Sequence, residues 1–343
     1  MIQRNRKKSI RSYIYDKANL LEACYVSYQG KSARQRQKAE VRAVMDDMDA
    51  FVERKNGEIR SGTYRVGDYR HFLLKDRKKR RRISVLPYGD RSVQNLYKSG
   101  IEPVIVNQAT DDMCAGLPGR GVTASEAKWC VVRKVQRILR TDEAVWMWQG
   151  DIRKFYDSIR NVIVMKQLER IISDKVVLEL VREHVMKQRE LAIGDPFSHL
   201  LASLVVAPLV RYLKANGATV VNYADDFWCV ARTKEEIYRI KNMAERFAVT
   251  RLRLHFKPSQ VRRISDAPFR FCGFVFYPNG KVFLCSDTKK RYVKSRHRRR
   301  SVASYNGMLI CCNSRHLRKK VEMNDNNRKR HGKGTDTLRW QAA

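Results

Sequence analysis

The stretch Tyr223-Ala224-Asp225-Asp226 lies between two runs of apolar and β-branched residues, 218–221 and 227–230. This pattern predicts two buried strands joined by a tight turn that carries two adjacent carboxylates. Burying two neighbouring acids costs free energy unless a cation neutralises them, and carboxylate oxygens are the ligands that Mg²⁺ prefers. On these four residues alone a solvated Asp-Asp turn is the simpler interpretation, so a metal site needs a third carboxylate elsewhere.

A third acid lies at the end of another predicted strand. Residues 145–152 are mostly apolar or aromatic and include Asp151 near their end, and a turn into a helix follows at 153–159. Taken alone, an Asp in this place fits a helix N-cap about as well as a metal site. Together with Asp225 and Asp226, Asp151 completes a set of three carboxylates of the kind that two-metal sites use.

A dense run of positive charge, 75–82, separates two further predicted strands at 71–74 and 83–86. Charge runs are common on solvated surfaces, and this run alone would indicate little. Because it is tied between the two strands of a hairpin, its cations are presented together, which suits a triphosphate or a nucleic-acid backbone.

The composition of the whole chain favours an anionic partner. Its 343 residues include 71 Lys plus Arg against 35 Asp plus Glu, a formal net charge of +36, and 43% hydrophobic residues suffice for a sizeable core. Such an excess of positive charge indicates nucleic acid, with a membrane surface as the alternative. No uninterrupted apolar stretch reaches the roughly 18 residues of a spanning helix, so no membrane partner is expected. Eight cysteines without a CxxC pair favour free thiols in a reducing cytoplasm.

The remaining segments are assigned by their patterns. Residues 1–60 predict helices with basic faces, and 191–213 predict a long apolar core helix preceded by a glycine loop. A β-hairpin is predicted within 269–282. The basic residues from 285 onward predict a helical lobe that binds a nucleic-acid backbone and ends in a disordered tail.

In this order, the segments resemble the sequence blocks of the reverse transcriptases, over about 72–282. The matching features are the basic hairpin ending at Arg82, Asp151 with the aromatic Tyr156 five residues on, the glycine loop at Gly194, the Tyr223-Ala224-Asp225-Asp226 turn, Lys257, and Phe271-Cys272-Gly273-Phe274.

Within the family, the chain looks most like the bacterial and phage enzymes of diversity-generating retroelements. Their glycine loop typically begins with Ile or Leu before Gly and ends in Ser-Gln, whereas most relatives begin it with Gln-Gly. Here the loop reads Ile193-Gly194-Asp195-Pro196-Phe197-Ser198, and His199 stands where that Gln is usual. Residues 304–309 also resemble the thumb segment of this group and of its group II intron and retron relatives.

The resemblance implies an α/β (α+β) right-hand polymerase with fingers, an antiparallel-sheet palm and a short helical thumb. The expected divisions are an N-terminal helical basic extension at 1–70, fingers at 71–145, a palm at 146–283 with finger-side helices at 160–192, and a thumb with a basic tail at 284–343.

The resemblance also implies a metal site. Asp151 and Asp225 would bind two Mg²⁺ ions, for which Mn²⁺ is a substitute, with Asp226 close by and the Ile152 carbonyl as a further ligand. One ion would activate the primer 3′-hydroxyl and the other would hold the triphosphate. Lys257 would protonate the leaving pyrophosphate, although a plain surface lysine explains this residue nearly as well.

The nucleotide would meet five further residues besides the metal site. Lys75 and Arg82 would neutralise its triphosphate. Tyr156 would stack under the deoxyribose and exclude a 2′-hydroxyl, with a core aromatic as the alternative interpretation. Gly194 would let another molecule approach the backbone. Ile193 would offer only apolar contact where relatives have a hydrogen-bonding Gln, which predicts low fidelity at template adenines.

The segment Phe271-Cys272-Gly273-Phe274 would grip the primer end, and a simple β-turn in the core explains its hydrophobicity equally well. The expected function is RNA-directed DNA polymerase, making cDNA in error-prone, mutagenic retrohoming. Its partners would be template RNA, RNA/DNA hybrid, dNTPs and a basic oligomeric accessory protein in the bacterial host cytoplasm. The alternatives are a retron or group II intron-type reverse transcriptase and, from another class, a non-catalytic basic RNA-binding protein with this fold.

Overall fold

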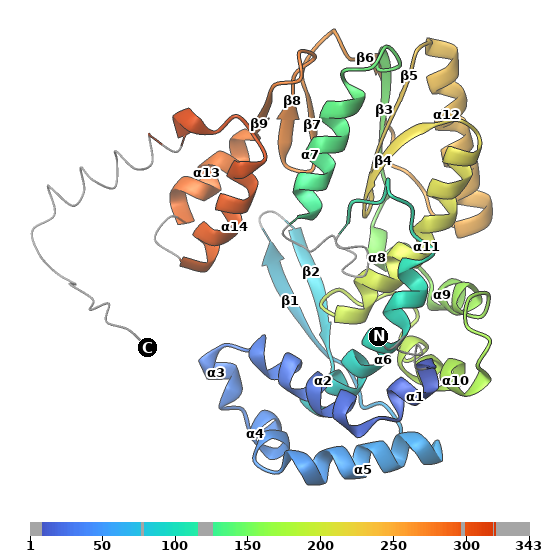
Figure 1. Cartoon of the computed structure of the whole chain (residues 1–343), viewed down its shortest axis with the longest axis vertical. Helices are drawn as coiled ribbons and strands as arrows, with labels where there is room; N and C mark the ends of the chain where they lie inside the picture. The colour runs from blue at the N-terminus through green and yellow to red at the C-terminus, as the bar shows by residue number, and fades with distance from the viewer. Residues whose placement is uncertain (1–8, 77–78, 116–125, 296–298, 318, 320–343) are drawn as a thin grey trace, which may run out of the picture.

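The computed structural model describes residues 9–76, 79–115, 126–295, 299–317 and 319, which form helices and three antiparallel sheets (Figure 1). This confirms the predicted α+β class. The strands are β1 (Arg70–Asp76), β2 (Lys79–Val85), β3 (Trp146–Asp151), β4 (Thr219–Tyr223), β5 (Asp226–Ala231), β6 (Val261–Arg263), β7 (Phe269–Phe271), β8 (Phe274–Phe276) and β9 (Val282–Leu284). The helices are α1 (Ile10–Ile14), α2 (Lys17–Gln29), α3 (Ala33–Arg36), α4 (Ala39–Met45), α5 (Met48–Ser61), α6 (Tyr88–Val106), α7 (Ala127–Ile138), α8 (Phe155–Ser158), α9 (Asn161–Leu168), α10 (Lys175–Val185), α11 (Pro196–Ala215), α12 (Lys234–Phe247), the π-helix η2 (Ala248–Leu252), α13 (Ser286–Ser295) and α14 (Arg299–Ile310).

A four-stranded sheet in the order β4-β5-β3-β6 positions the predicted acids. Its central strands β5 and β3 form as predicted, because their apolar residues are buried, including Trp148 and Phe227. Gly150 is required next to Asp151, since a Cβ at this position would lie 2.6 Å from the Trp148 ring. The sheet therefore admits only a glycine directly before the acid of β3.

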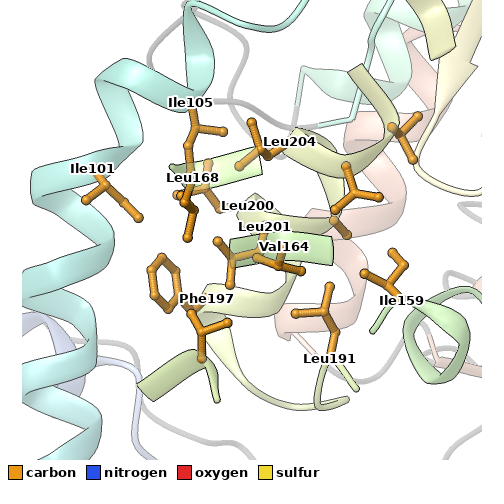
Figure 2. Packing of buried hydrophobic residues seen from close by; sticks show 14 of the residues in the cluster. Ile101, Ile105, Ile159, Val164, Leu168, Leu191, Phe197, Leu200, Leu201 and Leu204 are labelled. Atoms are coloured by element: carbon orange, nitrogen blue, oxygen red, sulfur yellow. The ribbon is translucent and has the colours of Figure 1, made fainter. Parts of the chain in front are cut away.

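Helix α11 is the core helix of the fold, as the sequence predicts. Pro196 occupies its first turn, and its apolar residues bury against α6, α9 and β4. Figure 2 shows its residues Leu200, Leu201 and Leu204 among the apolar side chains of α6 and α9. By length and composition α11 could cross a membrane, but 72% of its most apolar window is buried inside the fold, as is usual for a core helix.

The predicted basic hairpin is confirmed, but its charges are distributed differently. The sequence placed the cations between short strands at 71–74 and 83–86. Instead β1 continues to Asp76 and β2 begins at Lys79, so that the described cations lie on the strands themselves. Residues 77–78 lie outside the described part. Because cross-strand backbone pairing continues through charged residues, local charge alone did not mark where the strands end.

Asp195 ties the base of this hairpin to the core helix. Its carboxylate caps α11 by accepting the Phe197 N–H at 2.7 Å, and it also accepts the Tyr69 hydroxyl at 2.6 Å and the Gln94 amide at 2.7 Å. Tyr69 and Gln94 lie 126 and 101 residues away along the chain. Burial and the Asp195 charge raise the pKa of Tyr69, so its hydroxyl stays a donor.

The two ends of the chain add separate layers. Helices α1 to α5 form below the hairpin in Figure 1, where α1, α2 and α4 contact α6, which confirms the helices predicted within 1–60 for residues 9 onward. Strands β7 to β9 share a second apolar core with α7 and α14, and β7 and β8 confirm the hairpin predicted within 269–282. The predicted tail at 320–343 lies outside the described residues, and the domain boundaries at 70, 145 and 283 stay predictions.

Replacing Asp195 with alanine is expected to lower the free energy of unfolding by about 2–4 kcal/mol, because it removes a cap and leaves buried donors unsatisfied. The matched control is Thr233→Ala, which removes the cap that the Thr233 hydroxyl gives α12 through the Glu236 N–H. It should cost about 1 kcal/mol. Urea denaturation followed by circular dichroism measures both variants, and equal losses would show that Asp195 acts as a cap only.

Candidate active site

The sheet brings Asp151 and Asp226 face to face. In the antiparallel pairing of β3 with β5, their Cα atoms are direct cross-strand partners. Asp225 lies on the turn between β4 and β5, and its carbonyl accepts the Ile152 N–H at 3.1 Å. The three acids that the sequence predicted to act together therefore meet at one end of the sheet.

Asn222 fastens the turn that carries the acids. Its side-chain amide donates to the carbonyl of Ala224 at 3.0 Å and to that of Asp226 at 3.2 Å. Ala224 has a φ of 54°, a left-handed conformation that costs free energy for a residue with a Cβ. Sequence reasoning missed Asn222, although Asn residues that bond backbone groups two positions on are a known turn signal.

Burial and neighbouring negative charge raise the pKa of two of the acids. The pKa of Asp226 rises to about 7 because of burial and then the charges of Asp225 and Asp151, against the opposing effect of Lys257. Burial also raises the pKa of Asp225, and Asp151 adds to that shift. Lys257 offsets part of this charge, because its Nζ lies 2.6 and 2.7 Å from the two carboxylate oxygens of Asp151. The cluster keeps an excess of negative charge.

The donor chemistry of this cluster fits a divalent cation. Among the residues that the structure describes, no three or more His, Cys, Asp or Glu side chains are already arranged around one metal position. The three carboxylates nevertheless supply only hard oxygen ligands, and burial together with neighbouring negative charge raises the pKa of Asp225 and Asp226, a cost that a divalent cation would offset. Asp151, Asp225 and Asp226 are thus the residues that would hold such an ion.

Tyr156 lies beside the acid cluster on α8, the short helix that follows β3. Burial and the charge of Asp225 raise its pKa, so the phenol stays protonated at neutral pH. Its hydroxyl lies 3.3 Å from Nδ1 of His199 on α11. The neighbouring Phe155 is buried in the core.

The glycine loop contacts the chain's own hairpin. The Ile193 carbonyl accepts the Ser84 N–H of β2 at 2.9 Å. Gly194 has a φ of 97°, and a Cβ there would lie 2.6 Å from Cγ2 of Ile83. The sequence predicted that Gly194 admits another molecule, whereas its near neighbour here is β2 itself, because the loop pairs with that strand.

The two faces of the hairpin carry different cations. Since side chains alternate along a strand, the register puts Lys75 and Arg82 on one face and Arg81 on the other, together with Ile83. Ile83 packs toward Gly194, and the charge of Arg81 lowers the pKa of Asp225. Arg81 is thus the hairpin cation whose charge acts on the acid cluster. Sequence reasoning did not distinguish it from the other cations of the charge run. Because side chains alternate along a strand, its place two residues before the apolar Ile83 would have identified it.

The predicted grip segment lines a pocket with two of the acids. Cys272 and Gly273 form the two-residue turn between β7 and β8, with φ values of 49° and 89°. A pocket of about 290 Å³ is bounded by this turn together with Asp151 and Asp226. Burial and then the charge of Asp226 raise the pKa of Cys272.

The aromatic residues on either side of that turn are buried. Phe271 is 4% exposed and Phe274 is fully buried, and both belong to the second apolar core. The alternative of a core β-turn thus describes these two side chains, while Cys272 and Gly273 of the turn line the same pocket as Asp151 and Asp226.

Asp226→Asn is expected to raise the melting temperature in metal-free buffer at pH 8 by roughly 2–5 °C. The folded pKa of about 7 lies above the ordinary 3.8, so ionising Asp226 destabilises the fold above pH 7 and has no such effect below about pH 4. The gain should therefore shrink as the pH falls from 8 to 4. Calorimetry in EDTA measures it, with the exposed Asp266→Asn as control. A gain that stays constant with pH would contradict the shift.

Comparisons with known proteins agree with the fold. The family model described as reverse transcriptase (RNA-dependent DNA polymerase) matches residues 73–276, more than half of the chain. No curated protein matches the chain. Among solved structures, telomerase from Candida albicans with a fragment of telomeric RNA is similar, with a TM-score of 0.52 and 11% identity over 80% of this chain and 56% of that chain.

Apo telomerase from Candida tropicalis is also similar, with a TM-score of 0.47 and 8% identity over 64% of this chain and 49% of that chain. The chain spans about half the length of the telomerases it matches, and at such identities the likeness shows the fold alone. The expected right-hand polymerase fold is confirmed. Since the family match runs from the basic hairpin through all three acids to β8, this chain belongs to the reverse transcriptases.

Proposed function

We propose that this polymerase adds deoxynucleotides to a primer on template RNA by two-metal nucleotidyl transfer at Asp151, Asp225 and Asp226. The observation that carries the proposal is the direct cross-strand pairing of Asp151 with Asp226 beside Asp225. Mg²⁺ ions, or Mn²⁺ in their place, supply Lewis-acid activation of the primer 3′-hydroxyl and charge neutralisation at the triphosphate when bound. Asp151, Asp225 and the Ile152 carbonyl hold them, with Asp226 adjacent.

The cations of the hairpin and Lys257 neutralise or protonate the phosphate groups. Arg81 acts on the charge of Asp225, and Lys75 and Arg82 on the other face of the hairpin meet the outer phosphates or the template backbone. Lys257 has a second role, because an ammonium bonded to Asp151 stands where pyrophosphate leaves and can give it a proton.

Tyr156 selects the sugar. A half-buried ring beside Asp225 occupies the place under the incoming ribose, where a 2′-hydroxyl would clash with it. Ile193 and Gly194 border the same nucleotide from the loop that pairs with β2. The turn Cys272-Gly273, with Phe271 and Phe274 anchoring it in the core, holds the primer end against the pocket that it shares with Asp151 and Asp226.

The fingers, the palm, the thumb and the N-terminal extension each contribute to binding the nucleotide or the nucleic acid. The fingers, at 71–145, and the palm, at 146–283, enclose the RNA/DNA hybrid and the dNTP. The thumb beyond 284 and the N-terminal extension contribute positive charge for the nucleic-acid backbone. The net charge of +36 supports this assignment. The enzyme works in the cytoplasm of a bacterial host on a structured template RNA, together with a basic oligomeric accessory protein.

The subgroup that the loop sequence favours is that of diversity-generating retroelements. Ile193 before Gly194 supports error-prone synthesis at template adenines, because an isoleucine makes no hydrogen bond that checks the nascent pair. A retron or group II intron-type enzyme is the alternative within the family, and His199 in place of the usual Gln keeps it open. A non-catalytic RNA-binding protein is the alternative of another class, and the intact set of three acids argues against it.

Asp225→Asn is expected to lower primer extension by at least about 10³-fold, since it removes charge where the transition state needs stabilisation. Extension of a DNA primer on an RNA template with dNTPs and Mg²⁺ measures the loss. Asp266→Asn, which changes an exposed Asp in the segment after β6, is the matched control and should extend like the wild type. Equal extension by the Asp225 variant would support the non-catalytic alternative.

Ile193→Gln is expected to reduce misincorporation opposite template adenine several-fold, because it restores one hydrogen bond worth about 1 kcal/mol to the check on pairing. Sequencing of cDNA made from one adenine-rich RNA by the two enzymes measures the error spectrum. Errors opposite the other three bases serve as the internal control. An unchanged spectrum would remove the support that Ile193 gives to the subgroup.

A further inference from the structure

We propose that His199 is a positioning residue for sugar selection, acting through its hydrogen bond to the Tyr156 hydroxyl. The inference rests on the proposed role of Tyr156 as the residue that excludes a 2′-hydroxyl. Nδ1 of His199 and the Tyr156 hydroxyl oxygen are 3.3 Å apart, and they join α11 to α8 across 43 residues of sequence. Tyr156 thus has a polar anchor on the far end of its ring.

The two ends of this bond differ in rigidity. Helix α8 has only four residues and no side-chain N-cap bond, and so short a helix does not hold its shape without outside contacts. His199 lies in the first turn of the twenty-residue α11, between the buried Phe197 and Leu200. Asp195 caps this helix start. We therefore assign His199 as the residue that positions the Tyr156 ring, and not the reverse.

The chemistry of the pair agrees with this direction. Burial and the charge of Asp225 raise the pKa of Tyr156, so the phenol keeps its proton and can donate it to Nδ1 of a His199 tautomer protonated on Nε2. A ring held at its hydroxyl cannot swing away when a ribonucleotide presses on it. A ring without that anchor yields, and the steric exclusion of the 2′-hydroxyl weakens.

The position of His199 in the glycine loop makes the inference specific to this chain. The enzymes that the loop resembles usually carry Gln here. The Gln side chain has an acceptor oxygen and a donor amide, so it is the substitution that keeps a hydrogen bond to a phenol. Alanine cannot make this hydrogen bond. Comparing His199→Gln with His199→Ala therefore tests whether the hydrogen bond to Tyr156, rather than the histidine ring itself, is needed.

The test measures the ratio of kcat/KM for a dNTP to kcat/KM for the matching rNTP in single-nucleotide primer extension. His199→Ala and Tyr156→Phe, which removes only the hydroxyl, should each lower this ratio about 3–10-fold. The double variant should be no worse than either single variant, because both remove the same bond. His199→Gln should retain the wild-type ratio. Ser203→Ala, which removes a hydroxyl that bonds the His199 carbonyl, is the control within α11.

Two results from Tyr156→Phe and the double variant would overturn the inference. One is an unchanged, wild-type ratio in Tyr156→Phe, which contradicts the inference even if His199→Ala does not fold. The other is a loss in the double variant equal to the product of the single losses. The variant Tyr156→Ala distinguishes failure of the role of His199 from failure of the proposed role of Tyr156. If it leaves the ratio unchanged, the proposed role of Tyr156 fails, and if it relaxes the ratio while His199→Ala does not, only the role of His199 fails.

Discussion

The repulsion between Asp151 and Asp226 is the constraint on which the site depends. The sheet register puts them directly opposite each other, where like charges destabilise a strand pair, and burial brings the pKa of Asp226 to about 7. The surrounding structure keeps them together. Strand β3 is paired with β5 and β6, Asn222 holds the turn, and Lys257 bonds the carboxylate of Asp151. The fold thus maintains a concentration of negative charge that a divalent cation would relieve.

Much of this arrangement is predictable from sequence because its signals are local. The strands around the acids follow from apolar and β-branched runs, and the turn between them follows from its two carboxylates. The hairpin of β7 and β8 follows from its aromatic residues and glycine. The meeting of Asp151 with the acids of the turn was inferred from the family resemblance, and the register of β3 with β5 gives its physical basis.

The parts that sequence reasoning missed depend on contacts between distant segments. Arg81 was indistinguishable from its neighbours in the charge run until the register showed which face of the hairpin turns toward the glycine loop. The contact of Gly194 with Ile83 was also missed, since nothing near Gly194 in sequence shows that Ile83 lies where a Cβ would point. Asp195 was given no role within the glycine loop, although it accepts hydrogen bonds from two segments more than a hundred residues away.

The loop from 193 to 199 connects the parts that must act together on a nucleotide. Its first residues pair with β2, Asp195 holds the base of the hairpin, and His199 reaches Tyr156. These contacts converge on the start of α11, which is buried in the main core and therefore does not adjust independently at each point. The hairpin and the ring beside Asp225 are thus both fastened to the same end of one packed helix.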